Sequence, residues 1–60
     1  MLENEFWTRK DEMVEAINEK GYDVVEFNDE YAVIENEEET LELILGHANS
    51  TMWIEKIREI

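Results

Sequence analysis

The chain has 60 residues, of which 17 are acidic and 5 basic, so its formal net charge at neutral pH is −12. It contains no cysteine, which excludes disulfides, thiolate metal sites and a cysteine nucleophile. A chain of this length forms a single domain, residues 1–60, near the lower size limit for folding on an apolar core alone. Because 43% of its residues are hydrophobic, we expect a folded domain rather than disorder.

Apolar residues recur at helical spacing near the N-terminus. The stripe consists of Leu2, Phe6, Met13 and Ile17. This spacing predicts a helix that begins at about Leu2 or at about Thr8 and ends at Lys20. Thr8 followed by Asp11 would form a capping box and leave residues 1–7 as a separate arm, whereas the unbroken stripe favours one long helix.

The sequence also predicts roles for two residues that the apolar stripe does not include. Gly21 follows Lys20 and suits the left-handed position after a helix C-terminus. Trp7 lies off the apolar stripe, so it either covers the edge of the core or forms an exposed anchor for a partner.

Three short runs rich in β-branched and aromatic residues predict a three-stranded antiparallel sheet. The runs are Tyr22 to Phe27, Tyr31 to Glu35 and Thr40 to Leu45. A two-residue turn at Asn28 and Asp29 and a four-residue loop from Asn36 to Glu39 set the register. In that register the core face carries Val25, Phe27, Ala32, Ile34, Leu41, Leu43 and Leu45. The opposite face carries Tyr22, Val24, Glu26, Tyr31, Val33, Glu35, Thr40, Glu42 and Ile44.

The last segment has helical spacing again, with Trp53, Ile57 and Ile60 on one stripe. Asn49 or Ser50 would cap a helix from Thr51 to Ile60. The expected fold class is therefore α+β: a helix, a three-stranded antiparallel sheet and a short C-terminal helix.

Neither a catalytic nor a metal-binding pattern is present, and we expect a non-enzymatic protein without a cofactor. His47 is the only histidine, and neither Gly21 nor Gly46 belongs to a phosphate-binding loop. No apolar run approaches the ~20 residues that span a bilayer. The acidic N-terminus lacks the basic region of a signal peptide, so we expect no membrane partner and a cytoplasmic location.

The acidic residues are distributed unevenly, because no Lys or Arg occurs between Gly21 and His47. Residues two apart on a strand lie ~6.6 Å apart, close to the ~7 Å between successive phosphates of a nucleic-acid strand. Carboxylates on these strands and turns can therefore imitate phosphates. Direct binding to nucleic acid would be repulsive, so the expected partner is a basic nucleic-acid-binding protein.

In size, charge and order of predicted elements, the chain resembles small acidic inhibitors encoded by bacteriophages. These include anti-CRISPR proteins that occupy the DNA site of an effector nuclease, and phage inhibitors of uracil-DNA glycosylase. The resemblance implies an inhibitor that acts in the cytoplasm of a bacterial host. The Glu-Ser-Ile element of one glycosylase-inhibitor family is absent, so no site residue is carried over.

The first functional hypothesis is thus a non-enzymatic inhibitor that blocks a basic DNA- or RNA-binding site. Its candidate phosphate substitutes are Glu26, Glu35, Glu42, Asp29, Glu30, Glu37, Glu38 and Glu39. Its candidate anchors are Tyr22, Tyr31 and Trp7. The alternative is a homodimeric structural or regulatory module that pairs through its second sheet face and is acidic only for solubility.

Overall fold

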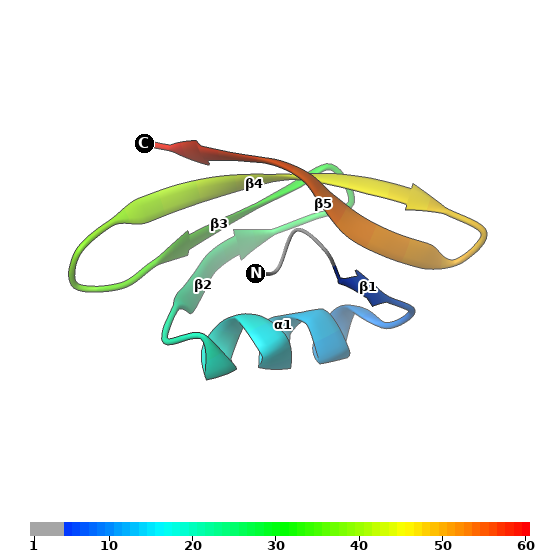
Figure 1. Ribbon diagram of the computed structural model, residues 1–60, viewed down its shortest axis with the longest axis horizontal. Helices are drawn as coiled ribbons and strands as arrows, with labels where there is room; N and C mark the ends of the chain where they lie inside the picture. The colour runs from blue at the N-terminus through cyan, green and yellow to red at the C-terminus, as the bar shows by residue number, and fades with distance from the viewer. Residues whose placement is uncertain (1–4) are drawn as a thin grey trace.

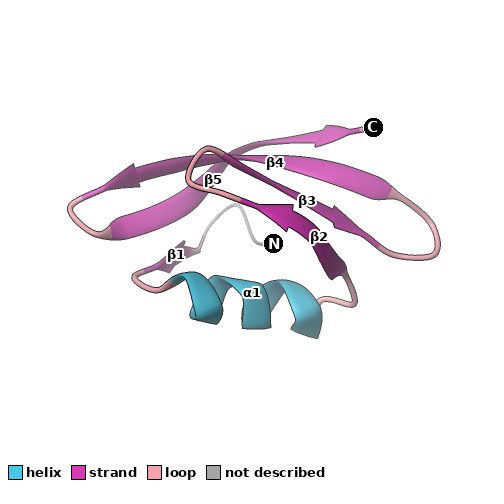
Figure 2. Cartoon of the chain, turned by 180° about the vertical axis from the view of Figure 1, so that it is seen from behind, coloured by secondary structure: helices cyan, strands magenta, loops and turns pink. Residues whose placement is uncertain are grey.

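The computed structural model describes residues 5–60 and contains one five-stranded antiparallel sheet and one helix (Figure 1, Figure 2). The elements are β1 (Phe6–Trp7), α1 (Lys10–Glu19), β2 (Asp23–Phe27), β3 (Tyr31–Glu35), β4 (Thr40–Ala48) and β5 (Thr51–Glu59). The strand order is β1-β5-β4-β3-β2. The sheet curls into a half-barrel, and α1 lies against its hollow side. The predicted three-stranded sheet flanked by two helices is therefore wrong.

Helix α1 is shorter than predicted, because Phe6 and Trp7 belong to an edge strand. Phe6 pairs with Trp53 and Trp7 pairs with Met52, which removes both residues from any helix. The N-cap is Arg9, without a side-chain hydrogen bond, so the predicted start at Leu2 or Thr8 is not observed. Leu2 itself lies outside the described residues.

The C-terminus of α1 confirms the expectation for Gly21. This glycine has φ +93°, a conformation that residues with a Cβ rarely adopt. Its N–H donates to the carbonyl of Asn18 at 3.0 Å, and the N–H of Tyr22 donates to the carbonyl of Ile17 at 3.3 Å. This pair of bonds is the Schellman motif, which ends the helix and directs the chain into β2.

The β3–β4 hairpin has the predicted register, with Ile34 opposite Leu41 and Ala32 opposite Leu43. Its four-residue loop closes through the N–H of Asn36, which donates to the carbonyl of Glu39 at 2.9 Å. Strands β3 and β4 therefore present the predicted side chains to the core.

The β2–β3 hairpin differs from the prediction by a β-bulge. The side chain of Asn28 accepts hydrogen bonds from the N–H groups of Glu30 and Tyr31, so the turn is wider than the expected two residues. Phe27 then lies opposite Ala32, and the register shifts between Val24 and Glu26. Val24 consequently packs against the core, while Val25, predicted to be in the core, is 57% exposed.

The predicted C-terminal helix is a strand. Asn49 and Ser50 have φ values of 51° and 68°, as a type I′ hairpin turn requires, and Ala48 pairs with Thr51 across it. They form a turn and do not cap a helix. The paired segment leads β5 back along β4 to Glu59, opposite Leu41.

A second bulge explains why this strand has helical spacing in the sequence. The register shifts where Leu45 pairs with Ile54 and Ile44 pairs with Lys56, so Glu55 is the extra residue. A bulge moves the alternation of sides by one residue. Ile54 and Ile57, three apart, thus both face the core, as they would on a helix.

Replacing Ser50 by Gly tests this turn. A residue with a Cβ pays a conformational cost at positive φ, and Asn-Gly is the preferred sequence for this turn. We expect Ser50→Gly to raise the free energy of unfolding by about 1 kcal/mol, measured by urea denaturation. Ser50→Ala, which keeps the Cβ, is the control and should give no gain. A loss in Ser50→Gly would instead indicate a helix cap.

The core fills the space between α1 and the hollow side of the sheet. Its buried members are Trp7, Met13, Ile17, Ala32, Ile34, Leu43, Leu45 and Ile54. No polar or charged residue among those described is buried with them. The charged side chains therefore lie on the outer surface, where their positions decide what the protein can bind.

Candidate interaction surface

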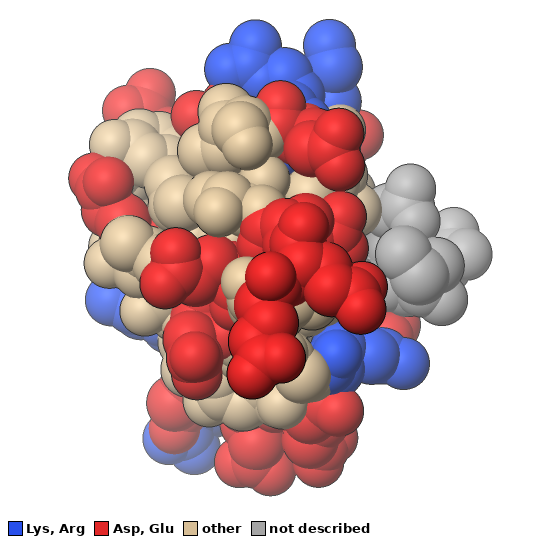
Figure 3. Space-filling view, turned by 90° about the vertical axis from the view of Figure 1, so that its left-hand side faces the viewer, with Lys and Arg blue, Asp and Glu red and all other residues tan. Residues whose placement is uncertain are grey.

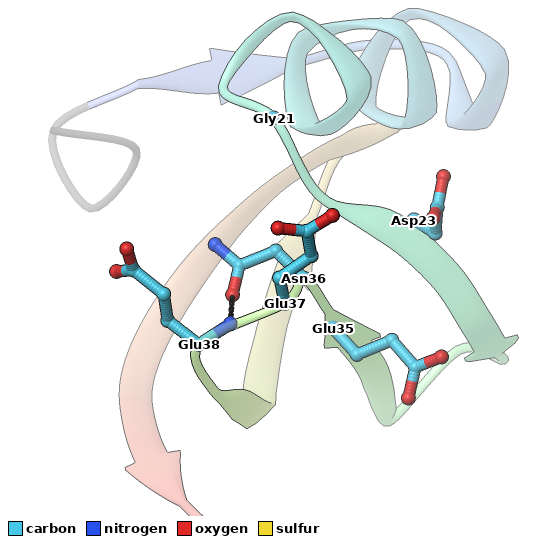
Figure 4. Close-up of a pocket in the computed structure, with 6 residues that line it drawn as sticks. All are labelled: Gly21, Asp23, Glu35, Asn36, Glu37 and Glu38. Atoms are coloured by element: carbon cyan, nitrogen blue, oxygen red, sulfur yellow. Dashed lines mark hydrogen bonds between the residues drawn. The ribbon is translucent and has the colours of Figure 1, made fainter.

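Carboxylates gather at one end of the molecule, around the loop between β3 and β4 (Figure 3). We call this group the acidic end, and it consists of Asp23, Glu35, Glu37, Glu38 and Glu39. A shallow hollow of about 610 Å³ lies there, lined by Gly21, Asp23, Glu35, Asn36, Glu37 and Glu38 (Figure 4). None of the lining residues is basic, so the hollow presents only negative charge.

Two of these carboxylates come from neighbouring strands. Asp23 of β2 and Glu35 of β3 are direct cross-strand partners. Like charges placed directly opposite each other destabilise a sheet. Within residues 5–60 neither forms an ion pair that would relieve this repulsion. The arrangement therefore costs stability and keeps both charges available.

The loop of the acidic end is held by short-range hydrogen bonds. The side-chain oxygen of Asn36 accepts from the N–H groups of Glu38 and Glu39 at 2.8 and 2.9 Å. The hydroxyl of Tyr22 donates to the carboxylate of Glu39, which ties the loop to the segment after α1. This hydrogen bond, together with partial burial and nearby negative charge, raises the pKa of Tyr22. The backbone that carries the loop carboxylates is thus held by hydrogen bonds in the free protein.

Of the three acids predicted on the outer sheet face, Glu26 and Glu42 have partners, whereas Glu35 belongs to the acidic end. Arg58 donates from Nε to Glu42 at 2.9 Å, because β5 lies beside β4 and places these residues opposite each other. Tyr31 donates its hydroxyl to Glu26 at 2.7 Å, and this bond is the main reason that the pKa of Tyr31 is raised. Lys56 lies opposite Ile44 on the same face. This face is therefore of mixed charge.

The remaining predicted site residues are separated from the acidic end. Asp29 and Glu30 lie in the exposed β2–β3 loop. Trp7 is 7% exposed and belongs to the core, so it fits the expectation of a core-edge residue and offers no exposed anchor. Of the candidate anchors, only Tyr22 contacts the acidic end, through Glu39.

The structure reveals an aromatic pair that the sequence reasoning missed. The rings of Phe6 and Trp53 lie 5.8 Å apart between centroids, and Phe6 is 65% exposed. The indole of Trp53 lies directly over Gly46, where a Cβ would come within 2.5 Å of Nε1. The predicted strand ended at Leu45, so Gly46 was expected in a connection; in the structure it lies within β4, where a glycine marks close approach of another group.

Gly46→Ala should displace the indole ring of Trp53 from its position over residue 46. Because the added methyl would overlap the ring, we expect a loss of about 1–3 kcal/mol in stability and a change in tryptophan fluorescence. Trp53→Ala removes the overlapping ring, so Gly46→Ala should cost much less in that background. An equal cost in both backgrounds would contradict the contact.

Comparison with protein-family profiles, with curated proteins and with solved structures finds no match for this chain. Among residues 5–60, no helix is long and apolar enough to cross a membrane. The same residues contain no group of three or more His, Cys, Asp or Glu side chains arranged to hold a metal ion.

Proposed function

We propose that the protein is a non-enzymatic inhibitor that occupies the basic nucleic-acid-binding site of a partner protein. The acidic end carries this proposal, because it collects carboxylates from two strands and one loop, with no Lys or Arg among the described residues that line its hollow. A phosphate-binding site is lined by Arg and Lys, whose hydrogen bonds to carboxylates are charge-assisted. Effector nucleases and DNA repair glycosylases are representative partners.

The hydrogen bonds that hold the loop of the acidic end support this function over general acidity. Carboxylates on flexible side chains of a mobile loop would lose conformational entropy on binding. Here the backbone is already ordered by Asn36 and by the Tyr22–Glu39 hydrogen bond. Of the acids first considered for phosphate imitation, Glu35, Glu37 and Glu38 remain as candidate phosphate substitutes, with Asp23 added, while Glu39 holds the loop through Tyr22. Glu26 and Glu42 are satisfied within the protein.

Competition with DNA tests the proposal. The immobilised protein is incubated with a bacterial lysate, and retained proteins are released with a DNA duplex at constant ionic strength. We expect release of a nucleic-acid-binding protein by DNA but not by an uncharged polymer. The acidic protein is then added to DNA cleavage and uracil-excision assays, where we expect it to inhibit the enzyme in competition with DNA. Retention unaffected by DNA would contradict the proposal.

The outer sheet face supports a second candidate, a homodimer. Phe6 and Val25 are 65% and 57% exposed, and Val33 and Ile44 are partly exposed on the same face. Burying such residues against a second copy would be favourable. Sedimentation should then show dimers, and the melting temperature should rise with protein concentration. A monomer with a constant melting temperature would exclude this candidate.

A further inference from the structure

A second cavity lies away from the acidic end. It has a volume of about 350 Å³ and is formed by the start of α1, the β2–β3 loop and the β4–β5 hairpin. Its lining residues are Thr8, Lys10, Phe27, Asn28, Asp29, Leu45, His47, Ser50, Thr51 and Met52. The β4–β5 hairpin and the start of α1 lie at the end of the molecule away from the β3–β4 loop (Figure 1).

The lining combines an apolar floor with opposite charges. Phe27, Leu45 and Met52 belong to the core or pack against it, so they supply a fixed apolar floor. Lys10 comes from α1 and has its ammonium 5.1 Å from the centre of the Phe27 ring. Asp29 comes from the β2–β3 loop and also lines this cavity. The cavity thus offers one cation and one anion above an apolar surface.

Lys10 and Asp29 are not joined to each other. Within residues 5–60 the ion pairs are Arg9–Asp11 and Arg58–Glu42, so neither lining charge is neutralised by a contact there. A ligand with an ammonium and a carboxylate group can satisfy both charges at once. Each of these contacts would be a charge-assisted hydrogen bond, which is stronger than one between neutral groups.

We propose that this cavity binds a free amino acid with an apolar side chain, in its zwitterionic form. Lys10 receives the carboxylate, Asp29 receives the ammonium, and the side chain lies on Phe27, Leu45 and Met52. Thr8, Ser50 and Thr51 line the same cavity, and their side chains carry hydroxyl groups that can form further hydrogen bonds. This binding is independent of the acidic end and of the proposed inhibition.

The test is an NMR titration of the isotopically labelled protein with L-leucine. Saturable shifts are expected for the amides of Lys10, Asp29 and His47. N-acetyl-leucine lacks the ammonium and isoamylamine lacks the carboxylate, so each should bind at least about tenfold more weakly. Equal binding of the three compounds, or no saturable shift at these residues, would overturn the proposal.

Two variants and a control complete the experiment. Lys10→Gln and Asp29→Asn change exposed side chains, and each should weaken leucine binding by about tenfold or more. Glu15→Gln removes one charge from an exposed residue of α1 outside both sites and should leave leucine binding unchanged. Amide spectra of the free variants show whether each is folded. Unchanged affinity in folded Lys10→Gln or Asp29→Asn would overturn the assigned roles.

Discussion

Leu43→Ala is expected to cost about 2–5 kcal/mol of stability, enough to unfold a large fraction of a domain this small. Leu43 has no exposed surface and lies in the middle of β4, opposite Ala32 on one side and Ile57 on the other. The substitution leaves a cavity between the sheet and α1, which the surrounding core cannot fill completely. Urea denaturation followed by circular dichroism measures the loss.

Ile44→Ala is the matched control, because Ile44 is the next residue on β4 and faces the outer side of the sheet. It is partly exposed, so its truncation should cost less than that of Leu43. If Leu43→Ala proves too unstable to fold, Leu43→Val tests the same position with a smaller cavity. A severe effect of Ile44→Ala with a neutral Leu43→Ala would mean that the two sheet faces are reversed.

Neutralising the acidic end should weaken partner binding by about 100-fold or more, since each charge-assisted contact contributes about 1.5–3 kcal/mol. The test variant carries Asp23→Asn, Glu35→Gln and Glu37→Gln. Because the first two substitutions remove a like-charge pair, the variant should be at least as stable as the parent. The loss should appear mainly as faster dissociation from the partner identified by DNA competition.

The control for this variant removes the same number of charges elsewhere. Glu12→Gln, Glu15→Gln and Glu55→Gln alter exposed residues of α1 and β5. General electrostatic attraction depends on total charge and would treat both variants alike. Equal losses of affinity in the two variants would therefore contradict a positioned phosphate mimic. A much smaller loss in the control than in the test variant would support it.

Local chemistry in the sequence was sufficient for part of the fold. Gly21 predicted the end of α1, because only a residue without a Cβ readily takes the conformation found there. The loop from Asn36 to Glu39 predicted the β3–β4 register, because loop length and side-chain alternation agree. The acids near this loop could also be anticipated, since turn residues are exposed.

Both bulges, by contrast, were decided by tertiary structure. The bulge at Val25 exchanges core and surface positions within β2, and the bulge at Glu55 gives β5 the spacing of a helix. Periodicity cannot distinguish such a strand from a helix, because Ile54 and Ile57 fall on one side in either case. Pairing with the long edge of β4 favours a strand for this segment, because that edge offers it backbone hydrogen bonds. A short terminal helix is only marginally stable by itself and would leave the edge of β4 unpaired.

The sequence alone also could not predict which side chains pair with the charged residues. Arg58 neutralises Glu42 only because β5 lies beside β4, and an assignment to a terminal helix hides that contact. Composition determined that the protein is strongly acidic and that its core is small. Strand pairing determined which carboxylates have a cationic partner and which lie next to other carboxylates. An ion pair depends on the distance between the charges in space and not on their separation along the chain.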